Sequence, residues 1–416
     1  MKAVPRFSPG FAWPETQRAL AALLGGRVVK GDGAADFSRE LGAYLGVKHA
    51  FLVPSARMGF WLALRAMDFD GGEIIFPGLT YYAMPAAAKL AGLQPRFVDI
   101  DDNLLLDLDR LEAAIGKDTR AIFPTHLYGR TVDMTRLMDI AARHNLPVFE
   151  DIAQGLGAKW QGQKVGTFGR FAIATFGPTK NITALGGACV FTDDDELAQR
   201  LGRALEAVAP ATTLPVLKAF GFATAMALAS WTPVFRLLVA PLLKLGRRRG
   251  VDLIAKATAD SPVDFTDGVP AWFFQGGVGH LMGQVGGASL AAMDERNARR
   301  RAGGLRLSAA LGDVDQVAVP QVRDGEEAIF MSFPLLVDDP DAFADLLLAR
   351  GVDTARGYMS ACADLPMFAG GGDCPRASEA LARMLHLPVH PGMNAALIDE
   401  VAAMVKDALA ARRGGA

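Results

Sequence analysis

Cysteine is scarce in this sequence. Three cysteines, Cys189, Cys362 and Cys374, occur in 416 residues and lie far apart along the chain. Such spacing argues against a disulfide framework and against a cysteine-based zinc site, and it is typical of a protein in a reducing compartment.

An excess of charge of one sign is also lacking. The chain has 43 Lys and Arg against 45 Asp and Glu, which leaves a formal net charge of -2. This balance gives no electrostatic argument for nucleic acid as a partner. The first residues, MKAVPRFSPGFAWPE, contain no apolar core of signal-peptide length, so we expect a cytoplasmic protein.

Two short patterns resemble a metal site and a phosphate-binding loop, but neither has the arrangement that such a site requires. His386 and His390 are four residues apart, but Pro388 lies between them, so the two rings do not share a helical face. We therefore expect no metal site. The glycine run 370–372 is not followed by Lys-Ser or Lys-Thr, which excludes a phosphate-binding P-loop.

Apolar residues, in contrast, are abundant. They make up 51% of the chain, and the mean hydropathy of +0.20 is high for a soluble enzyme. The segment Ala219–Phe235 has no charge over 17 residues, and Leu237–Leu243 continues it. This run is short for a membrane-spanning helix, which needs about 20 apolar residues. We expect Pro215, Pro233 and Pro241 to break it into a hairpin.

Short apolar runs alternate with helical patterns through the first half of the chain, which predicts an α/β fold with a mostly parallel sheet and flanking helices. Ligands in such sheets bind beyond the carboxyl ends of the strands. Four residues that carry useful chemistry directly follow expected strands: Ser55, Tyr81, His126 and Asp151. This placement predicts one shared site, although a core histidine bonded to backbone is an equal alternative for His126.

The segment 148–190 is typical of a pyridoxal phosphate site. Asp151 ends a short apolar run, and Lys180 follows in a small-residue turn before a glycine pair. A lysine can form a Schiff base with the cofactor, and a carboxylate can keep the pyridine nitrogen protonated, so that the ring withdraws electrons. A single lysine is more often a solvated surface group, and the surrounding motifs decide against that alternative here.

Those motifs resemble the DegT/DnrJ/EryC1/StrS family of sugar aminotransferases. The family's EDxAQ segment reads Glu150 to Gln154 here, its VGxFG segment reads Val165 to Gly169, and its Ser-x-x-x-x-Lys-Asn turn reads Thr175 to Asn181. The resemblance implies the type I aminotransferase fold, pyridoxal 5'-phosphate as cofactor and a homodimer. It also implies amino transfer from an amino acid, plausibly glutamate, to a keto group of a sugar-like acceptor, which in the family is usually nucleotide-linked. A membrane-bound apolar segment in this chain would favour a lipid-linked acceptor instead.

The resemblance also implies roles for individual residues. Lys180 would be the catalytic Schiff-base lysine, Asp151 would hold the pyridine nitrogen, and Gln154 would reach the phenolic oxygen of the ring. Tyr81 would stack on the ring; the alternative is that it only packs a helix start. The remaining cofactor-binding residues would hold the phosphate: Ser55, Ala56, Arg57 and Thr175. Ala56 and Arg57 replace the family's Gly-Thr, and without the later motifs an ordinary capped helix would explain this turn equally well.

Three features depart from the family and leave alternatives open. Residues 207–265 read as an apolar insertion, and 214–249 suits either a monotopic anchor on an anionic membrane at the inner face or a helical pair buried in a dimer interface. The family's Asn-x-Arg pair, which reaches the partner subunit, is absent, and His280 lies near the arginine position. A sugar dehydratase, which carries histidine in place of the lysine, and a non-catalytic membrane protein with the same fold are the rival functions.

Because the chain is longer than a usual single domain, two domains are expected. We predict a large cofactor-binding domain over 1–298, which includes the insertion, and a small α+β domain over 299–416.

Overall fold

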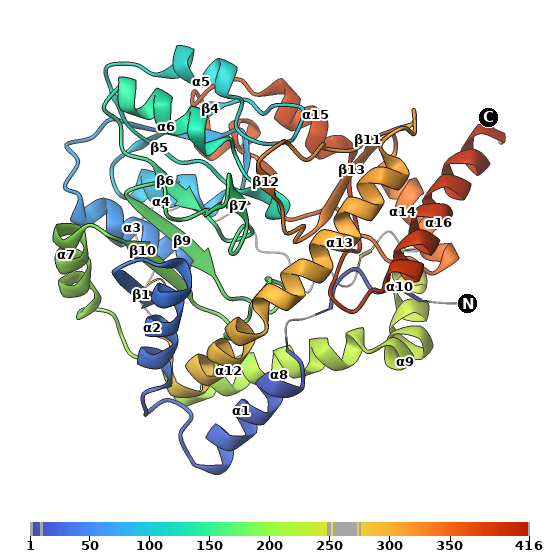
Figure 1. The fold of residues 1–416 in the computed structure, drawn as a ribbon, viewed down its shortest axis with the longest axis horizontal. Coiled ribbons are helices and arrows are strands. Elements are labelled where there is room, and N and C mark those ends of the chain that lie inside the picture. The colour runs from blue at the N-terminus through green and yellow to red at the C-terminus, as the bar shows by residue number, and fades with distance from the viewer. Residues whose placement is uncertain (1–2, 9–10, 248–250, 253–272, 274–275, 415–416) are drawn as a thin grey trace.

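The computed structural model describes residues 3–8, 11–247, 251–252, 273 and 276–414. Residues 248–250 and 253–265 of the expected insertion, including Arg248 and Arg249, lie outside the described residues. Figure 1 shows a sheet with helices around it on one side of the molecule and a smaller group of strands and helices next to both chain ends.

Seven strands form the central sheet. Hydrogen bonds give the orders β4-β2-β5 and β6-β9-β10-β1, and single bridges at Ile122–Val148 and Thr125–Asp151 join β5 to β6. The antiparallel ladders in this sheet are those of β10 with β9 and β1, so the expected mostly parallel sheet is confirmed. The strands are β1 His49–Val53, β2 Glu73–Pro77, β4 Gln94–Val98, β5 Thr119–Ile122, β6 Phe149–Asp151, β9 Phe171–Thr175 and β10 Ala188–Thr192.

Helices cover the sheet, and several begin at a side chain that accepts a backbone N–H. Ser55, Asp107, Asp133 and Asp194 cap α3, α5, α6 and α7 in this way, which satisfies donors that a helix start leaves unpaired. The helices of this part are α1 Trp13–Leu24, α2 Gly33–Leu45, α3 Ala56–Ala66, α4 Ala83–Leu90, α5 Leu108–Ala114, η1 Leu127–Gly129, α6 Met134–Arg143, α7 Asp195–Leu205 and α12 His280–Ala291.

The main core lies between the sheet and these helices and is rich in phenylalanine. Phe149 and Phe171 stack with their ring centroids 4.3 Å apart, and Phe60 and Phe123 lie 4.6 Å apart. All four side chains are buried. Burying rings of this size stabilises the part of the sheet where β6 ends at Asp151, because each aromatic side chain removes a large apolar area from water.

The C-terminal part has its own core around the antiparallel sheet β11-β13-β15. Residues 326–337 contain two separate strands, because β12 ends at Glu327 and β13 begins at Phe333. The predicted boundary 298/299 falls inside α13. The elements are α13 Met293–Leu311, β11 Val317–Ala318, β12 Glu326–Glu327, β13 Phe333–Val337, α14 Pro340–Arg350, η4 Cys362–Asp364, η5 Pro366–Phe368, α15 Pro375–Arg383, β15 Met384–Leu387 and α16 Ala395–Gly414.

Short strands join the two parts. β12 pairs with β7, β7 with β8, and β14 with β3. The N-terminal residues also belong to the C-terminal core, because Val4 bridges Val352 and Arg6 forms an ion pair of 2.8 Å with Asp353. The strands not yet given are β3 Leu79–Thr80, β7 Lys159–Trp160, β8 Gln163–Lys164 and β14 Ser360–Ala361.

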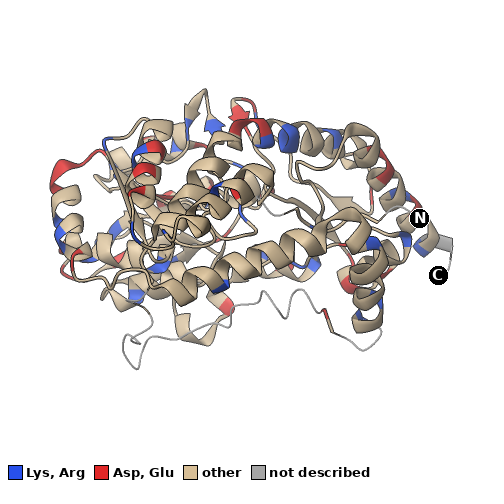
Figure 2. Cartoon of the chain, turned by 90° about the horizontal axis from the view of Figure 1, so that it is seen from below, with Lys and Arg blue, Asp and Glu red and all other residues tan. Residues whose placement is uncertain are grey.

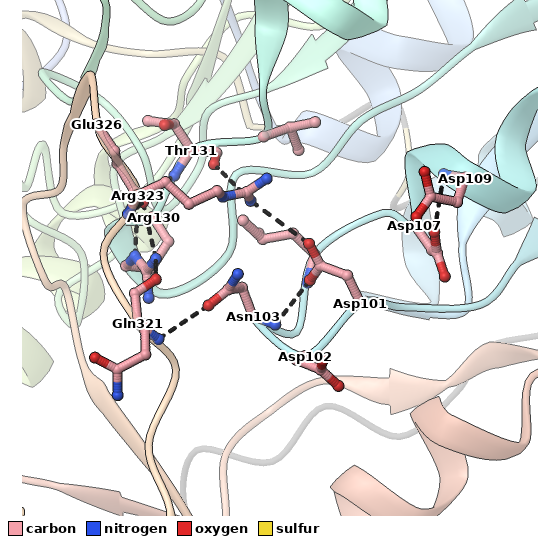
Figure 3. A network of polar contacts seen from close by, with 12 residues as sticks. Asp101, Asp102, Asn103, Asp107, Asp109, Arg130, Thr131, Gln321, Arg323 and Glu326 are labelled. Carbon is pink, nitrogen blue, oxygen red and sulfur yellow. Dashed lines mark hydrogen bonds and ion pairs between the residues drawn. The ribbon is translucent and has the colours of Figure 1, made fainter. Parts of the chain in front are cut away.

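A buried ion pair fastens the C-terminal part to the large one (Figure 3). Arg130 follows η1 and donates to both carboxylate oxygens of Glu326, at 2.6 and 2.8 Å. Glu326 also accepts the backbone N–H groups of Thr131 and Arg323. Both charged side chains are almost wholly buried. Because every contact of this carboxylate is a charged or backbone donor, the pair holds β12 in one position.

The apolar segment, called the hairpin below, is not one continuous helix: as the sequence predicted, it is interrupted, because α8 ends at Ser230 and α9 begins just before Pro233. α10 turns away from α8 and packs on α14 (Figure 1), and the other two prolines do not interrupt a helix. Pro215 and Pro233 lie in the first turns of α8 and α9, where no N–H donor is required. Pro241 follows a π-helical turn, which already changes the hydrogen-bond pattern there. The hairpin consists of α8 Thr213–Ser230, α9 Thr232–Val234, the π turn η2 Phe235–Val239 and α10 Ala240–Arg247.

One face of this hairpin is buried and the other is not. Val216 and Ala223 of α8 pack into the cluster formed with α1 and α12, while Phe235 and Leu243 pack against α14. By length and composition alone, α8 is long and apolar enough to cross a membrane, and 17% of it is buried inside the protein. Seen from below, the long helix across this face is nearly free of charged residues (Figure 2).

Candidate active site

One cavity of about 700 Å³ lies beyond the carboxyl ends of the central strands. Residues from the large part, the N-terminal segment and the C-terminal part line it. All eight residues that the sequence placed in a cofactor site contribute to its lining: Ser55, Ala56, Arg57, Tyr81, Asp151, Gln154, Thr175 and Lys180.

Lys180 lies in the loop that connects β9 to β10. Backbone hydrogen bonds from Phe176 to Gly187 and from Gly186 to Phe176, both 3.0 Å, close the base of this loop. Gly187 has φ +80°, a conformation that residues with a side chain rarely adopt, and an added Cβ would lie 2.8 Å from Val278. The glycine pair therefore allows the chain to enter β10 while the loop keeps Lys180 in the cavity.

The charges of Lys180 and Asp151 act on each other in this cavity. Burial lowers the pKa of the Lys180 amine, and the nearby Asp151 carboxylate opposes that shift. Burial raises the pKa of Asp151, against the hydrogen bond from Ala153 N–H at 2.9 Å and the positive charge of Lys180. An amine with a lowered pKa is available in its neutral, nucleophilic form, which a Schiff-base lysine requires.

Glu150, next to Asp151, has a structural task. Its carboxylate accepts the backbone N–H groups of Gly166, Phe168 and Gly169 at 2.7 to 2.8 Å. Glu150, the first acid of the EDxAQ segment, thus holds the VGxFG segment against β6. Gly169 has no room for a side chain, because a Cβ there would lie 2.4 Å from the Val148 oxygen. The two motifs occur together because one binds the other.

His126 belongs to the same support and is a core histidine, so its alternative role near the cofactor does not hold. Its ring is fully buried, its Nε2 lies 3.3 Å from Glu150, and its Nδ1 accepts the N–H of Val132. It does not line the cavity, whereas the preceding residue Thr125 does.

The helix α3 and the end of β9 provide anion-binding groups. Ser55 caps α3 by accepting the N–H of Met58 at 3.3 Å, so Ala56 and Arg57 form the first turn of the helix at the cavity wall. The start of a helix attracts anions through its backbone N–H groups and its dipole. Among the described residues, the buried Oγ1 of Thr175 has no hydrogen-bond partner. A hydroxyl in this state favours a bound acceptor such as a phosphate oxygen.

Tyr81 and Gln154 complete the predicted set. Tyr81 lies in the wall of the cavity with its ring centroid 5.0 Å from that of Tyr82, and α4 begins after both residues. The side-chain oxygen of Gln154 accepts the N–H of Tyr128 at 2.8 Å, which fixes the orientation of the amide. Tyr128 has φ +60° and continues the wall toward the C-terminal part.

Sequence reasoning missed the C-terminal side of the cavity. Arg300, His386 and His390 line it, and all three side chains are buried or nearly so. Burial lowers the pKa of each histidine to about 4, with further lowering by Arg356 for His386 and by Arg300 for His390. The spacing of these histidines predicts only that they do not share a helical face, which says nothing about a place in the cavity wall. The described residues contain no group of three His, Cys, Asp or Glu side chains that could hold a metal ion.

His280, which lies near the position of the family's missing arginine, is used within its own chain. Its Nδ1 accepts the N–H of Gly33 at 2.9 Å and its ring is buried. An added Cβ at Gly33 would lie 2.3 Å from the backbone oxygen of His280. This close contact of α12 with α2 leaves the His280 ring no path to a partner subunit.

The residues present fit pyridoxal phosphate. A half-buried lysine and a buried carboxylate share the cavity with a helix start and a hydroxyl that has no partner among the described residues. Together these groups match the amine-reactive carbon, the ring nitrogen and the phosphate of that cofactor.

Comparison with known proteins finds relatives along most of the chain. The sequence model of the DegT/DnrJ/EryC1/StrS aminotransferase family matches residues 13–227 and 279–406. A dTDP-3-amino-3,4,6-trideoxy-alpha-D-glucose transaminase from Streptomyces venezuelae is 29% identical over 388 residues, which are 91% of this chain and 88% of that protein. A pleiotropic regulatory protein from Geobacillus stearothermophilus is 38% identical over 191 residues, and this alignment spans about half of its length, 51%, and 45% of this chain.

A solved structure gives the same result for the fold. The crystal structure of S. venezuelae DesV in complex with a ketimine intermediate superposes with a TM-score of 0.76 at 26% identity and covers 98% of both chains. The expected type I fold is therefore confirmed.

Proposed function

This chain belongs to the DegT/DnrJ/EryC1/StrS aminotransferase family, and we propose that it transfers an amino group from an amino acid, plausibly glutamate, to a keto group of a sugar-like acceptor. The enzyme is a pyridoxal-phosphate-dependent aminotransferase. The observation that carries the proposal is that Lys180 and the buried Asp151 share one cavity with the α3 start and with the Thr175 hydroxyl, which has no partner among the described residues.

Each predicted residue has a task that its surroundings support. When bound, the cofactor supplies a ring that withdraws electrons from the carbon that loses a proton. Asp151 holds the ring nitrogen protonated, and a cation there favours the carboxylate that burial alone would disfavour. Lys180, neutral at its lowered pKa, accepts and returns the proton. Thr175 and the first turn of α3 would hold the phosphate, and Tyr81 would stack on the ring.

The test compares two lysine variants of the holoenzyme. Wild type and Lys48→Ala should show the absorbance of a Schiff base and lose it when L-glutamate is added. Lys180→Ala should bind the cofactor without that absorbance and give no turnover. Lys48 is a matched control because it is an exposed lysine whose ion pair with Asp195 lies outside the cavity. Turnover by Lys180→Ala at the wild-type rate would refute the assignment.

We infer a homodimer from the resemblance, with contacts that differ from those of the family. The absent Asn-x-Arg pair and the internal hydrogen bond of His280 mean that other residues must meet the partner. The molar mass in solution, measured by light scattering, tests the dimer.

We also propose that the hairpin of α8 to α10 rests on an anionic lipid surface at the cytoplasmic face. Its outward side exposes large apolar side chains, among them Trp231 at 60% and Leu237 at 72%. Residues 212–247 contain no Asp or Glu, whereas Lys218 and Arg236 are exposed there. An apolar face with positive charge only is complementary to an anionic membrane rather than to a second copy of itself.

Sedimentation with liposomes that contain anionic phospholipid tests this surface. Wild type should co-sediment, Leu237→Glu should remain in solution, and Leu305→Glu on α13 should behave as wild type because Leu305 is an exposed leucine outside the hairpin. If Leu237→Glu instead dissociates a dimer and the wild type does not co-sediment with liposomes, the hairpin is a subunit interface and the membrane proposal is wrong.

A further inference from the structure

A second cavity lies beside the active site, beneath the turn of the hairpin. Its volume is about 520 Å³, within the range of sites that hold small molecules. Ser230, Trp231 and Thr232 of the turn line it, and Ser8 and His390 line both this cavity and the active-site cavity. The active site and the apolar hairpin are therefore adjacent spaces that meet at two shared residues.

The second cavity has a mostly apolar wall. Arg236 is its one charged residue apart from the shared histidine, among the residues that the structure describes. The apolar lining comes from the N-terminal segment, the hairpin and the C-terminal helix: Ala3, Val4, Pro5, Phe11, Ala227, Trp231 and Leu397. A wall of this kind suits a hydrocarbon better than a nucleotide, since a buried sugar or phosphate needs polar partners.

Arg300 lies in the active-site wall near the junction of the two cavities, and no carboxylate among the described residues forms an ion pair with it. Arg300 is 4% exposed, and within the described residues its side chain donates a long hydrogen bond of 3.5 Å to the side-chain oxygen of Asn297. Burial and the neighbouring charge of Arg296 lower its pKa to about 10. A buried guanidinium normally pairs with an anion, because desolvation without a partner is costly.

Burial lowers the pKa of His390, and the positive charge of the nearby Arg300 lowers it further. Among the described residues, neither of its ring nitrogens has a hydrogen bond of good geometry, although the Pro5 carbonyl lies near enough to act on its pKa. Two polar side chains without strong partners, both facing the active-site cavity where it meets the apolar one, form an anion site between two different environments.

We propose that the two cavities together bind one amphiphilic acceptor, a sugar joined through a phosphate to a hydrocarbon chain. The keto sugar would lie at Lys180, the phosphate at Arg300 and His390, and the first part of the chain in the second cavity, from which it leaves toward the hairpin. This inference rests on the proposed amino transfer and names its substrate class. The amino transfer itself forms and breaks bonds only at the sugar, so the phosphate and the chain are unchanged.

The arrangement explains why an apolar hairpin is placed next to this particular site. Figure 1 shows α8 and α9 running from α12 toward the N-terminal end of the chain. The turn residues Ser230 to Thr232 line the second cavity together with His390 and residues 3–5. If the outer face of the hairpin rests on lipid, a lipid-linked substrate enters the second cavity without leaving the membrane.

Binding of farnesyl phosphate to the holoenzyme, measured by calorimetry below its micelle concentration, tests the proposal. The bound cofactor keeps the probe out of the cofactor's own phosphate site. We expect farnesyl phosphate to bind wild type at least about tenfold more tightly than inorganic phosphate or farnesol. Ser230→Trp, which fills the second cavity, and Arg300→Met, which removes the charge, should each weaken it about tenfold or more, since each removes more than about 1.4 kcal/mol.

Ala225→Trp is the matched control, because this residue lies on the exposed side of α8 and does not line either cavity. Retained cofactor absorbance shows that each variant is folded, and Ala227→Leu replaces Ser230→Trp if the larger side chain is not tolerated. Equal binding of inorganic phosphate and farnesyl phosphate, or no effect of either cavity variant, would overturn the proposal. The glutamate reaction is measured on the same samples, so a failure of amino transfer is seen separately.

Discussion

Replacing Thr175 with valine should change cofactor binding and apoprotein stability in opposite directions. Threonine and valine have almost the same shape, so the substitution removes one hydroxyl and little else. The buried Oγ1 of Thr175 has no partner among the described residues. In the apoprotein this hydroxyl is a cost, whereas in the holoenzyme we expect it to donate to the cofactor phosphate.

The magnitudes follow from the usual values for hydrogen bonds. A hydrogen bond to a charged group contributes about 1.5–3 kcal/mol, and an unpaired buried polar group costs about 1–3 kcal/mol. Thr175→Val should therefore raise the dissociation constant of pyridoxal phosphate about 10- to 150-fold. The same variant should unfold at an equal or higher temperature than the wild type when both are free of cofactor.

Titration of the apoprotein with cofactor, followed by absorbance, gives the first quantity, and thermal unfolding gives the second. Thr175→Ser keeps the hydroxyl and should bind the cofactor almost as wild type does. Thr192→Val is the matched control on β10, because its hydroxyl donates to Arg170 at 2.7 Å and accepts from Asp194. That variant should lose stability and keep its cofactor affinity. An unchanged affinity in Thr175→Val would show that this hydroxyl does not hold the phosphate.

Two further predictions concern the frame around the site. Glu326→Gln should lower the free energy of unfolding by about 3 kcal/mol, because it leaves Arg130 buried without its charge partner. Burial raises the pKa of Glu326, but Arg130 and the backbone donors together lower it below the ordinary value of 4.5. The stabilisation is therefore present above pH 4.5 and is lost as the pH falls through the lower pKa of the folded state. Chemical unfolding should show a large difference between variant and wild type at pH 7 and a smaller one at pH 3. Gly169→Ala should lower the free energy of unfolding by about 1–3 kcal/mol and loosen the segment beside Asp151, because the added Cβ would meet the Val148 oxygen. Gly116→Ala is the control: its Cβ would point into open space and its φ is not positive, so its free energy of unfolding should be unchanged in the same assay. Equal stability of the two alanine variants would contradict this reasoning.

The chemical half of the site was predictable because it is local in the chain. Asp151 and Lys180 lie 29 residues apart in one segment that forms β6, β9 and β10. The order of apolar runs and small residues there determines which residues follow strands. The pairing of Glu150 with the VGxFG segment is also short in sequence, so the motif already contained both partners.

The other half depends on contacts between distant residues. Arg300 is one of three consecutive arginines in a polar helix, and only the packing of α13 decides which of them is buried. His390 follows a Pro-Val turn with no periodic pattern. The ambiguity of His126 was resolved by Glu150 and Val132, whose distances from its ring could not be read from the sequence.

The hairpin shows a third kind of limit. Composition predicted its apolar character and its two-helix form, but the effect of each proline depends on its place within a turn. Pro215 lies at the third position of α8, where it is tolerated, although the same residue in mid-helix would not be. A shift of one turn in the helix start, which composition does not determine, would reverse the outcome.

The pairing of residues 4–6 with residues 352–353 has a consequence for synthesis. Arg6 and Asp353 are separated by 347 positions, and Val4 lies in the same core as the helices that follow residue 300. During translation the N-terminal segment leaves the ribosome long before its partners exist, so it must wait as an unpaired chain while the central sheet forms. The active-site wall at Ser8 can then close only when the last third of the protein has been made, which keeps an incomplete chain from presenting a finished site.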